Sequence, residues 1–199
     1  MQAIGASIQA GLRGAIGFLA NKPNAKDAFD LSLHGVAVSF LAPLIVLPLH
    51  LMLSTLEFTT PDGSNANLMK FDIWYYILRW VTFPIIMIPL AVLIDRKNQV
   101  LSFLVGWNWS NVVIEAISIL PIFLLASSAT GAIGAQIILM VVGVYLMIYR
   151  WRIAKSLLSI GGWSATAIVA IDMLSTYVAI VLSGGLGDLP QPPGPPPAS

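Results

Sequence analysis

Residues 73–123 read IWYYILRWVTFPIIMIPLAVLIDRKNQVLSFLVGWNWSNVVIEAISILPIF. Two apolar segments are joined here by a short charged turn, Asp95–Gln99. Each segment is at least as long as the roughly 20 residues that a helix needs to cross the hydrocarbon core of a bilayer. The stretch therefore predicts a transmembrane helical hairpin.

The whole chain has the composition of a membrane protein. Apolar residues make up 57% of its 199 residues and charged residues 10%, whereas about a quarter of the residues in a typical soluble domain are charged. The chain has no cysteine and two histidines, which excludes disulfides and thiolate metal sites and leaves too few histidines for a typical haem or zinc site. Because phosphate-binding, zinc and serine-hydrolase motifs are also missing, we expect no enzyme activity, no cofactor and no metal.

Long apolar segments recur along the chain and predict five transmembrane helices within a domain of residues 33–183. Their expected bounds are 33–56, 73–94, 100–126, 132–149 and 157–182. Prolines at 43 and 48 in the first segment, and at 84 and 89 in the second, each remove a helix hydrogen bond, which membranes tolerate where neighbours satisfy the freed carbonyl groups. The predicted fold class is an all-α polytopic membrane protein.

The segments on either side of this domain have a different character. Residues 1–20 repeat apolar side chains every three or four positions, which predicts an amphipathic helix that lies in the membrane interface or packs on the protein itself. Residues 57–72 are polar and rich in turn formers, and we expect a loop there. Residues 184–199 are rich in Pro and Gly and are expected to form an extended tail without a core.

The basic residues predict the orientation in the membrane. All but two of the Lys and Arg residues fall on one side of the predicted spans, namely Arg13, Lys22, Lys26, Arg96, Lys97, Arg150, Arg152 and Lys155. The positive-inside rule then places the N-terminus in the cytoplasm and the C-terminal tail in the periplasm, if the membrane is a bacterial inner membrane. Arg96, Lys97, Arg150, Arg152 and Lys155 are also expected to attract anionic lipid headgroups.

Three charged residues lie within the predicted spans. Counting 1.5 Å per residue places Arg79 roughly 9 Å below the outer surface, and Glu115 and Asp172 about 16 Å below it. A charge at the bilayer centre costs at least about 2.5–3.5 kcal/mol, so these side chains should face one another. His50 lies at a depth similar to that of Arg79 and belongs to the same predicted cluster.

The third span adds a polar stripe to this cluster. Asn108, Asn111 and Glu115 follow one another at positions i, i+3 and i+7, which places them on one helix face. The single guanidinium of Arg79 can bind one carboxylate bidentately. We expect the second carboxylate to be protonated, bound to His50, or bound to a backbone group freed by Pro48.

Two interpretations of this cluster remain open. It forms either a functional site, namely a proton or ion path or a polar substrate pocket, or a polar pin that determines how the helices assemble through hydrogen bonds worth about 0.6–2 kcal/mol each. The cytoplasmic half of the spans is almost entirely apolar, and this favours the pin.

Three features lie between residues 73 and 182: the charged turn Asp95–Gln99, the start of the third span at Phe103–Trp107 (FLVGW), and the basic link Tyr149–Leu157 (YRWRIAKSL). In these features the chain resembles the bacterial members of the Yip-domain family of membrane proteins. The resemblance implies five spans, a cytoplasmic N-terminus and the role of a membrane organiser, and it supplies no catalytic residues.

These patterns together predict a non-enzymatic scaffold or accessory subunit. Its expected partners are membrane lipids and other integral membrane proteins or a second copy of itself, and no nucleic acid. The alternative is a small proton- or ion-coupled transporter that uses Glu115 and Asp172, with Arg79 as the counter-charge.

Overall fold

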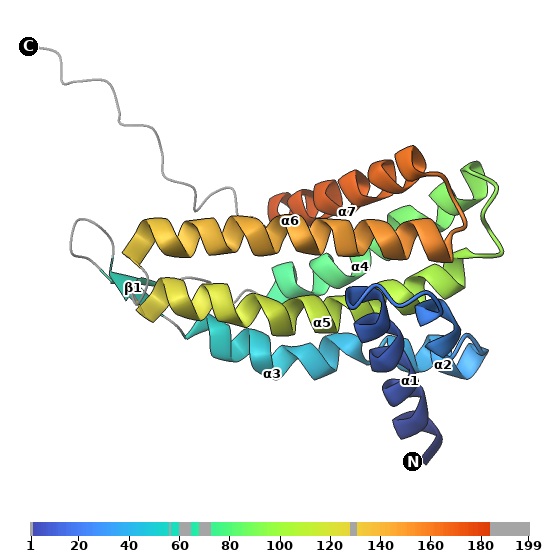
Figure 1. Cartoon of the computed structure of the whole chain (residues 1–199), viewed down its shortest axis with the longest axis horizontal. Helices are drawn as coiled ribbons and strands as arrows, with labels where there is room; N and C mark the ends of the chain where they lie inside the picture. Colours follow the sequence, from blue (N-terminus) through green and yellow to red (C-terminus); the bar gives the residue numbers. More distant parts are fainter. Residues whose placement is uncertain (1, 56, 60–64, 68–72, 128–130, 184–199) are drawn as a thin grey trace, which may run out of the picture.

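The chain folds into a helical bundle (Figure 1), a computed structural model that describes residues 2–55, 57–59, 65–67, 73–127 and 131–183. The helices are α1 (Gln2–Leu19), α2 (Leu33–Ser39), α3 (Ala42–Ser54), α4 (Ile73–Leu93), α5 (Val100–Ser127), α6 (Gly131–Leu157) and α7 (Gly162–Leu182), with a 3-10 turn η1 (Ala25–Ala28). Among the described residues, five segments are long and apolar enough to cross a membrane: α2 together with α3, and each of α4, α5, α6 and α7. The predicted all-α, multi-pass membrane fold is confirmed.

Helix α5 is the centre of the bundle. Two-thirds (67%) of its apolar segment is buried inside the protein, against 22–33% for the other four spans. It contacts α1, α2, α3 and α6, while α7 packs between α4 and α6. The charged and polar residues of the third predicted span therefore lie in the interior, where other helices surround them.

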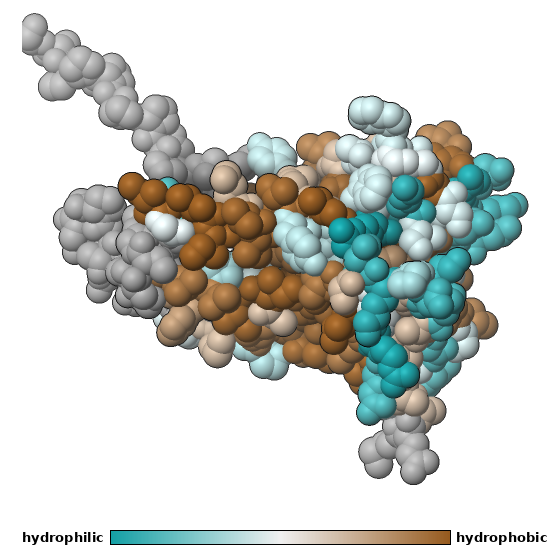
Figure 2. Space-filling view, in the orientation of Figure 1, coloured by the Kyte–Doolittle hydropathy of each residue, from teal (hydrophilic) through white to brown (hydrophobic). Residues whose placement is uncertain are grey.

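The two ends of the bundle differ in character. One end carries α1 and the turns that join α4 to α5 and α6 to α7, and we call it the α1 end (Figure 1). The opposite end carries the strands β1 (Glu57–Thr59) and β2 (Asn65–Asn67), and we call it the hairpin end. Hydrophilic side chains gather at the α1 end, and a hydrophobic belt covers the middle of the molecule (Figure 2).

The first span is interrupted rather than continuous. It ends as α2 at Ser39 and resumes as α3 at Ala42, so that Pro43 falls in the first turn of a new helix, where its missing N–H group costs nothing. The hydroxyl of Tyr76 on α4 donates a hydrogen bond to the carbonyl oxygen of Pro43. This hydrogen bond connects α4 to the first turn of α3.

Part of the predicted loop at 57–72 has regular structure. β1 and β2 pair antiparallel, with Glu57 opposite Asn67 and Thr59 opposite Asn65. The expectation of a plain loop was therefore wrong for these two strands. Strands of three residues are too short to show an alternating hydrophobic pattern in a polar sequence. The rest of the loop, the predicted turn at 128–130 and the tail at 184–199 lie outside the described residues.

The boundary between the last two spans was also predicted wrongly. α6 continues two turns beyond Tyr149 to Leu157, and α7 begins at Gly162. The basic residues between them are good helix formers, so they extend α6 instead of ending it. The chain turns through Ser159, whose φ of 52° is left-handed, and through Gly161, the N-cap of α7.

Helix α1 packs on the bundle, which is one of its two predicted positions. An added Cβ at Gly11 would lie 2.2 Å from the indole ring of Trp109 on α5, so the close approach of the two helices requires glycine there. The hydroxyl of Tyr149 donates a 3.0 Å hydrogen bond to the carbonyl oxygen of Ala15. Ile4 and Ile16 of the predicted apolar stripe remain exposed. Ile8, Leu12 and Leu19 of the same stripe are half-buried and pack against the core. The stripe is thus divided between the bundle and the surroundings of the protein.

Candidate functional site

Two ion pairs lie in the interior of the bundle. Nη2 of Arg79 on α4 contacts Oε1 of Glu115 on α5, and Nη1 of Arg150 on α6 contacts Oδ2 of Asp172 on α7. The side chains of Glu115 and Asp172 are only 6% and 7% exposed. Each buried carboxylate is therefore matched by a guanidinium from a different helix.

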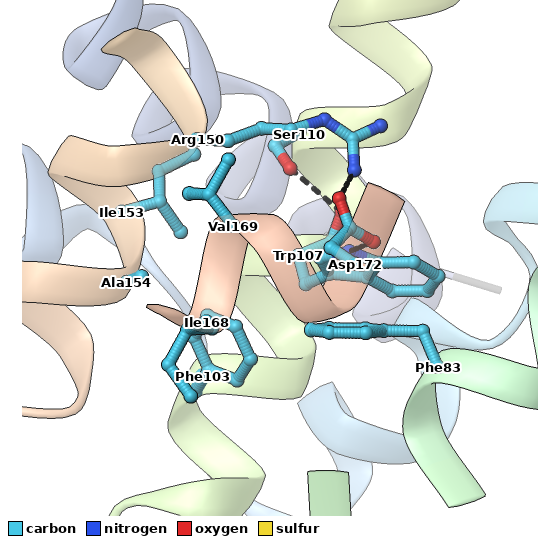
Figure 3. A pocket seen from close by; sticks show the side chains of 10 residues that line it. All are labelled: Phe83, Phe103, Trp107, Ser110, Arg150, Ile153, Ala154, Ile168, Val169 and Asp172. Carbon is cyan, nitrogen blue, oxygen red and sulfur yellow. Dashed lines mark hydrogen bonds and ion pairs between the residues drawn. The ribbon is translucent and has the colours of Figure 1, made fainter. Parts of the chain in front are cut away.

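Helix α5 also binds the second ion pair. Nη2 of Arg150 donates a 2.9 Å hydrogen bond to Oδ1 of Asn111, and the indole N–H of Trp107 donates a 3.1 Å hydrogen bond to Oδ1 of Asp172. Figure 3 shows Arg150 and Trp107 both reaching Asp172, with Phe83 and Phe103 below. The pair thus connects α6 and α7 to the central helix.

The two pairs occupy different depths. Counting 1.5 Å per residue from the α1 end of each helix, Arg150 lies about 10 Å and Asp172 about 15 Å inward. Arg79 and Glu115 lie about 21–22 Å inward on the same scale. The charged groups therefore form two successive layers within the membrane-spanning part of the bundle.

Aromatic side chains close the cluster toward the α1 end. The ring of Phe83 lies 4.9 Å from that of Trp107 and 6.0 Å from that of Phe103, while Trp80 meets Trp107 edge-on at 6.0 Å. The void that remains beside Asp172 among these rings measures about 10 Å³ (Figure 3). That volume is the minimum for a single water molecule, about 10–15 Å³. No wide polar route leads through this layer of the described residues.

A larger cleft lies on the other side of the charges, between α4, α6 and α7. Its volume is about 360 Å³, and Arg79, Arg150 and Asp172 line it together with Tyr75 and Thr176. The remaining lining residues are apolar, namely Gly143, Leu146, Met147, Val169 and Met173. Polar groups inside a membrane span thus face a space large enough for a ligand.

The structure brings Arg79 and Glu115 together but gives Asp172 a different partner from any of the three that were expected. Asp172 is bound by Arg150, which the sequence analysis had placed at the membrane surface as a topogenic residue. The signal that could have found it is charge balance: two buried carboxylates and one buried arginine require a second cation, and Arg150 is the first basic residue after the fourth predicted span.

The other predicted cluster residues separate into different environments. Asn111 belongs to the second ion pair, whereas Asn108 turns toward α2 and donates a 3.0 Å hydrogen bond to Oγ of Ser39. His50 is buried on α3, and its ring lies 4.9 Å from that of Tyr76. Trp107, which was not among the predicted cluster residues, is in direct contact with the cluster.

The remaining topogenic residues lie at the α1 end. Nη1 of Arg96 donates a hydrogen bond to the carbonyl oxygen of Asp95, and Lys97 is exposed. On α6, Arg152 is half-buried and Nζ of Lys155 lies 4.8 Å from the ring centre of Trp151. These residues gather basic charge on one side of the hydrophobic belt.

In the part of the chain that the structure describes, no group of three or more His, Asp or Glu side chains is placed to hold a metal ion. Comparison with known proteins finds no match to a family model, to a curated protein or to a solved structure. The resemblance to Yip-domain proteins therefore stays a prediction. The argument for a function must come from the paired charges and the cleft beside them.

Proposed function

We propose that this chain is a non-enzymatic scaffold or accessory subunit of a bacterial inner membrane, with its N-terminus in the cytoplasm. It assembles there with other integral membrane proteins or with a second copy of itself. The observation that carries the proposal is the pairing of both buried carboxylates with arginines of other helices. Ion pairs of this kind hold helices together, and a scaffold role does not require them to separate or to change their protonation.

The geometry around Asp172 favours a static role. A carboxylate that carries protons or ions must release its partner and face each side of the membrane in turn. Asp172 is instead held by Arg150 and by the indole of Trp107, and the aromatic rings around Phe83 close the way toward the α1 end. Removing one member of such a buried pair costs about 3–5 kcal/mol, so the pair resists separation.

The surface of α6 supports a role in assembly. Of the described side chains from Ile133 to Tyr145, none is buried, and the exposed ones include Ile137, Met140 and Val144. This half of the helix is therefore available to lipid or to a helix of a partner. The resemblance of residues 73–182 to membrane organisers is in keeping with this role.

One observation favours transport as a second candidate function. The cleft of about 360 Å³ gives access to Arg79 and Asp172 from between α4, α6 and α7. In this alternative, Glu115 and Asp172 bind protons or cations that enter through the cleft, and the arginines act as counter-charges.

Two measurements on the purified full chain separate these functions. Extraction in mild detergent is expected to yield a defined oligomer or a stoichiometric complex with another membrane protein. In liposomes that contain a pH-sensitive dye, the protein is expected to carry no proton flux above that of protein-free liposomes. A flux that Glu115→Gln abolishes while assembly stays normal would contradict the scaffold.

A second variant guards against simple misfolding. Glu115→Gln leaves Arg79 without its carboxylate, so a loss of assembly alone is ambiguous. The exchange Arg79→Glu with Glu115→Arg keeps both charges and their neutral sum. If the charges are a pin, this double variant should assemble better than either single variant.

A further inference from the structure

We propose that the cleft between α4, α6 and α7 binds the head of an anionic amphiphile, an oxyanion (carboxylate or phosphate) attached to an apolar chain. The chain would lie in a neighbouring groove between α6 and α7. This inference goes beyond a scaffold role, because it assigns a ligand to the charged site.

The first argument is the charge of the cleft. Its ionisable lining residues are Arg79, Arg150 and Asp172, while Glu115 does not line it. Glu115 pairs with Arg79 and Asp172 pairs with Arg150, so the two ion pairs together are neutral. Because Glu115 does not line the cleft, an oxyanion that enters meets two guanidinium groups and only one carboxylate.

The second argument is the number of donors that point at the cleft. A guanidinium has five N–H donors. Arg79 contacts Glu115 through Nη2, and Arg150 contacts Asp172 through Nη1 and Asn111 through Nη2. The two side chains keep 20% and 21% of their surface exposed. Exposed N–H groups within a span need an acceptor, and an oxyanion supplies short, charge-assisted hydrogen bonds to them.

The third argument is the apolar groove beside the cleft. Its volume is about 510 Å³, and Met147, Val169 and Met173 line both it and the cleft. Ile148, Trp151, Thr166 and Ala170 form the rest of its lining. A molecule with an anionic head and an apolar chain can therefore occupy both spaces at once, and flexible methionine side chains adapt to such a chain.

The route of entry also favours an amphiphile over a free ion. The aromatic rings of Trp80, Phe83 and Trp107 pack beneath the charges toward the α1 end. On the cleft side, Gly143, Met147 and Met173 are exposed on membrane-spanning helices. A ligand that comes from the bilayer reaches the arginines directly.

The most direct test fills the cleft without touching a charge. A Cβ added at Gly143 meets no atom within 4 Å, so Gly143→Leu can be accommodated, and its side chain occupies the space beside the arginines. Gly5→Leu on α1 is the matched control, because a Cβ there also meets no atom within 4 Å and Gly5 does not line the cleft.

Binding is measured on the full chain in detergent by native mass spectrometry with three probes: oleic acid, dioleoyl phosphatidic acid and dioleoyl phosphatidylcholine. The unmodified chain should bind at least one anionic probe about tenfold more tightly than the phosphatidylcholine, because a hydrogen bond to a charged group is worth about 1.5–3 kcal/mol. Gly143→Leu should lose about tenfold in this affinity, and Gly5→Leu should stay within about twofold of the unmodified chain. Preference for the fatty acid or for the phosphatidic acid identifies the head group.

A charge variant tests the anion preference separately. Arg79→Gln with Glu115→Gln removes one whole ion pair, so the total charge of the two pairs stays neutral while the cleft lining keeps one guanidinium instead of two. This variant should bind the anionic probes and the phosphatidylcholine with similar affinity. Equal binding of all three probes by the unmodified chain, or full anion binding by Gly143→Leu, would overturn the proposal. Displacement of the anionic lipid by inorganic phosphate alone would also overturn it, because the apolar chain would then contribute nothing.

Discussion

Asp172 illustrates how a single residue determines the interior of this protein. This residue lies on α7. Its carboxylate forms an ion pair with Arg150 on α6 and accepts a hydrogen bond from the indole N–H of Trp107 on α5. Arg150 in turn donates to Asn111. Because three helices meet at one carboxylate, loss of its charge should loosen all three and leave Arg150 as an unpaired cation.

The first prediction follows from this arrangement. Asp172→Asn keeps the size of the side chain but removes its charge, and it should destabilise the protein by about 3–5 kcal/mol because a buried guanidinium is left uncompensated. The measurement is unfolding in mixed detergent and sodium dodecyl sulfate, followed by circular dichroism. Arg152→Gln on the same helix is the control and should change stability by less than about 0.5 kcal/mol.

A double variant sharpens this prediction. Arg150→Met with Asp172→Leu removes both charges, and replacing a whole buried pair by apolar residues is often neutral or stabilising. The double variant should therefore recover at least half of the stability that Asp172→Asn loses. Equal loss in the single and double variants would mean that packing, and not charge, accounts for the effect.

The two ion pairs differ in how far the sequence could predict them. The sequence predicted that Arg79, Glu115 and Asp172 face one another but left open which carboxylate Arg79 binds, because both carboxylates have the same predicted depth; the structure pairs Arg79 with Glu115. The pairing of Asp172 with Arg150 depends on α7 lying between α4 and α6, and periodicity along one helix carries no information about which helices are neighbours. The separation of Asn108 from the cluster has the same cause.

Among the elements, α1 shows how a helix can present two different faces. Its buried residues include Ser7, Gly11, Gly14 and Ala15, whereas Ile16 is 53% exposed. Sequence periodicity identified an apolar stripe of which Ile8, Leu12 and Leu19 pack against the core. It did not identify the close contact at Gly11, because small side chains contribute little to hydrophobic periodicity. The extension of α6 to Leu157 was not predicted, because a sequence does not show whether a basic residue lies within a helix or just beyond its end.

The second prediction concerns the close contact of α1 with α5. Gly11→Leu should displace α1 from the bundle, because even a Cβ at this position would lie 2.2 Å from the ring of Trp109. Overpacking of this kind costs about 1–3 kcal/mol or more. The chain has no native cysteine, so spin labels at Gln9→Cys and Lys97→Cys can report the displacement as a longer and broader distance.

Gly5→Leu again provides the matched control, since it leaves the contact with Trp109 intact. An unchanged label distance in Gly11→Leu would mean that α1 is not held at this position.

The third prediction concerns the polar link between α1 and α2. The carboxylate of Asp30 accepts hydrogen bonds from the hydroxyls of Ser32 and Ser7, and Oγ of Ser32 accepts from the backbone N–H of Gly35 at 3.1 Å. The hydrogen bond from the Ser32 side chain is the main cause that lowers the pKa of Asp30 below its usual value, and the one from Ser7 adds to it. The link should therefore be present above the ordinary pKa of about 3.9 and lost as the pH falls through the lowered value.

The same pair of spin labels tests this link. Their distance should stay constant between pH 7 and about pH 5 and should broaden below about pH 4. Asp30→Asn should remove this transition. A transition that persists in Asp30→Asn would contradict the role of this carboxylate.

At the scale of the whole molecule, charge and hydropathy divide the bundle into three zones. Hydrophilic side chains gather at the α1 end and hydrophobic ones cover the middle on the face that Figure 2 shows, while the β-strands lie at the opposite end (Figure 1). The number of spans was predictable because each one is a long apolar segment. The order of packing was not, because lipid-facing and protein-facing apolar surfaces have the same composition.

The last prediction is the direction in which the bundle crosses the membrane. Arg96, Lys97, Arg152 and Lys155 all lie at the α1 end, and the translocation of positively charged segments is disfavoured, so this end should face the cytoplasm. Single cysteines report this through a maleimide that cannot cross membranes, applied to intact spheroplasts of a bacterial host. Lys97→Cys should react only after the membrane is permeabilised, and Asn67→Cys at the hairpin end should react at once. The reverse pattern would contradict the orientation. Mixed labelling at both sites would mean that the charge difference between the two ends is too small to select one topology.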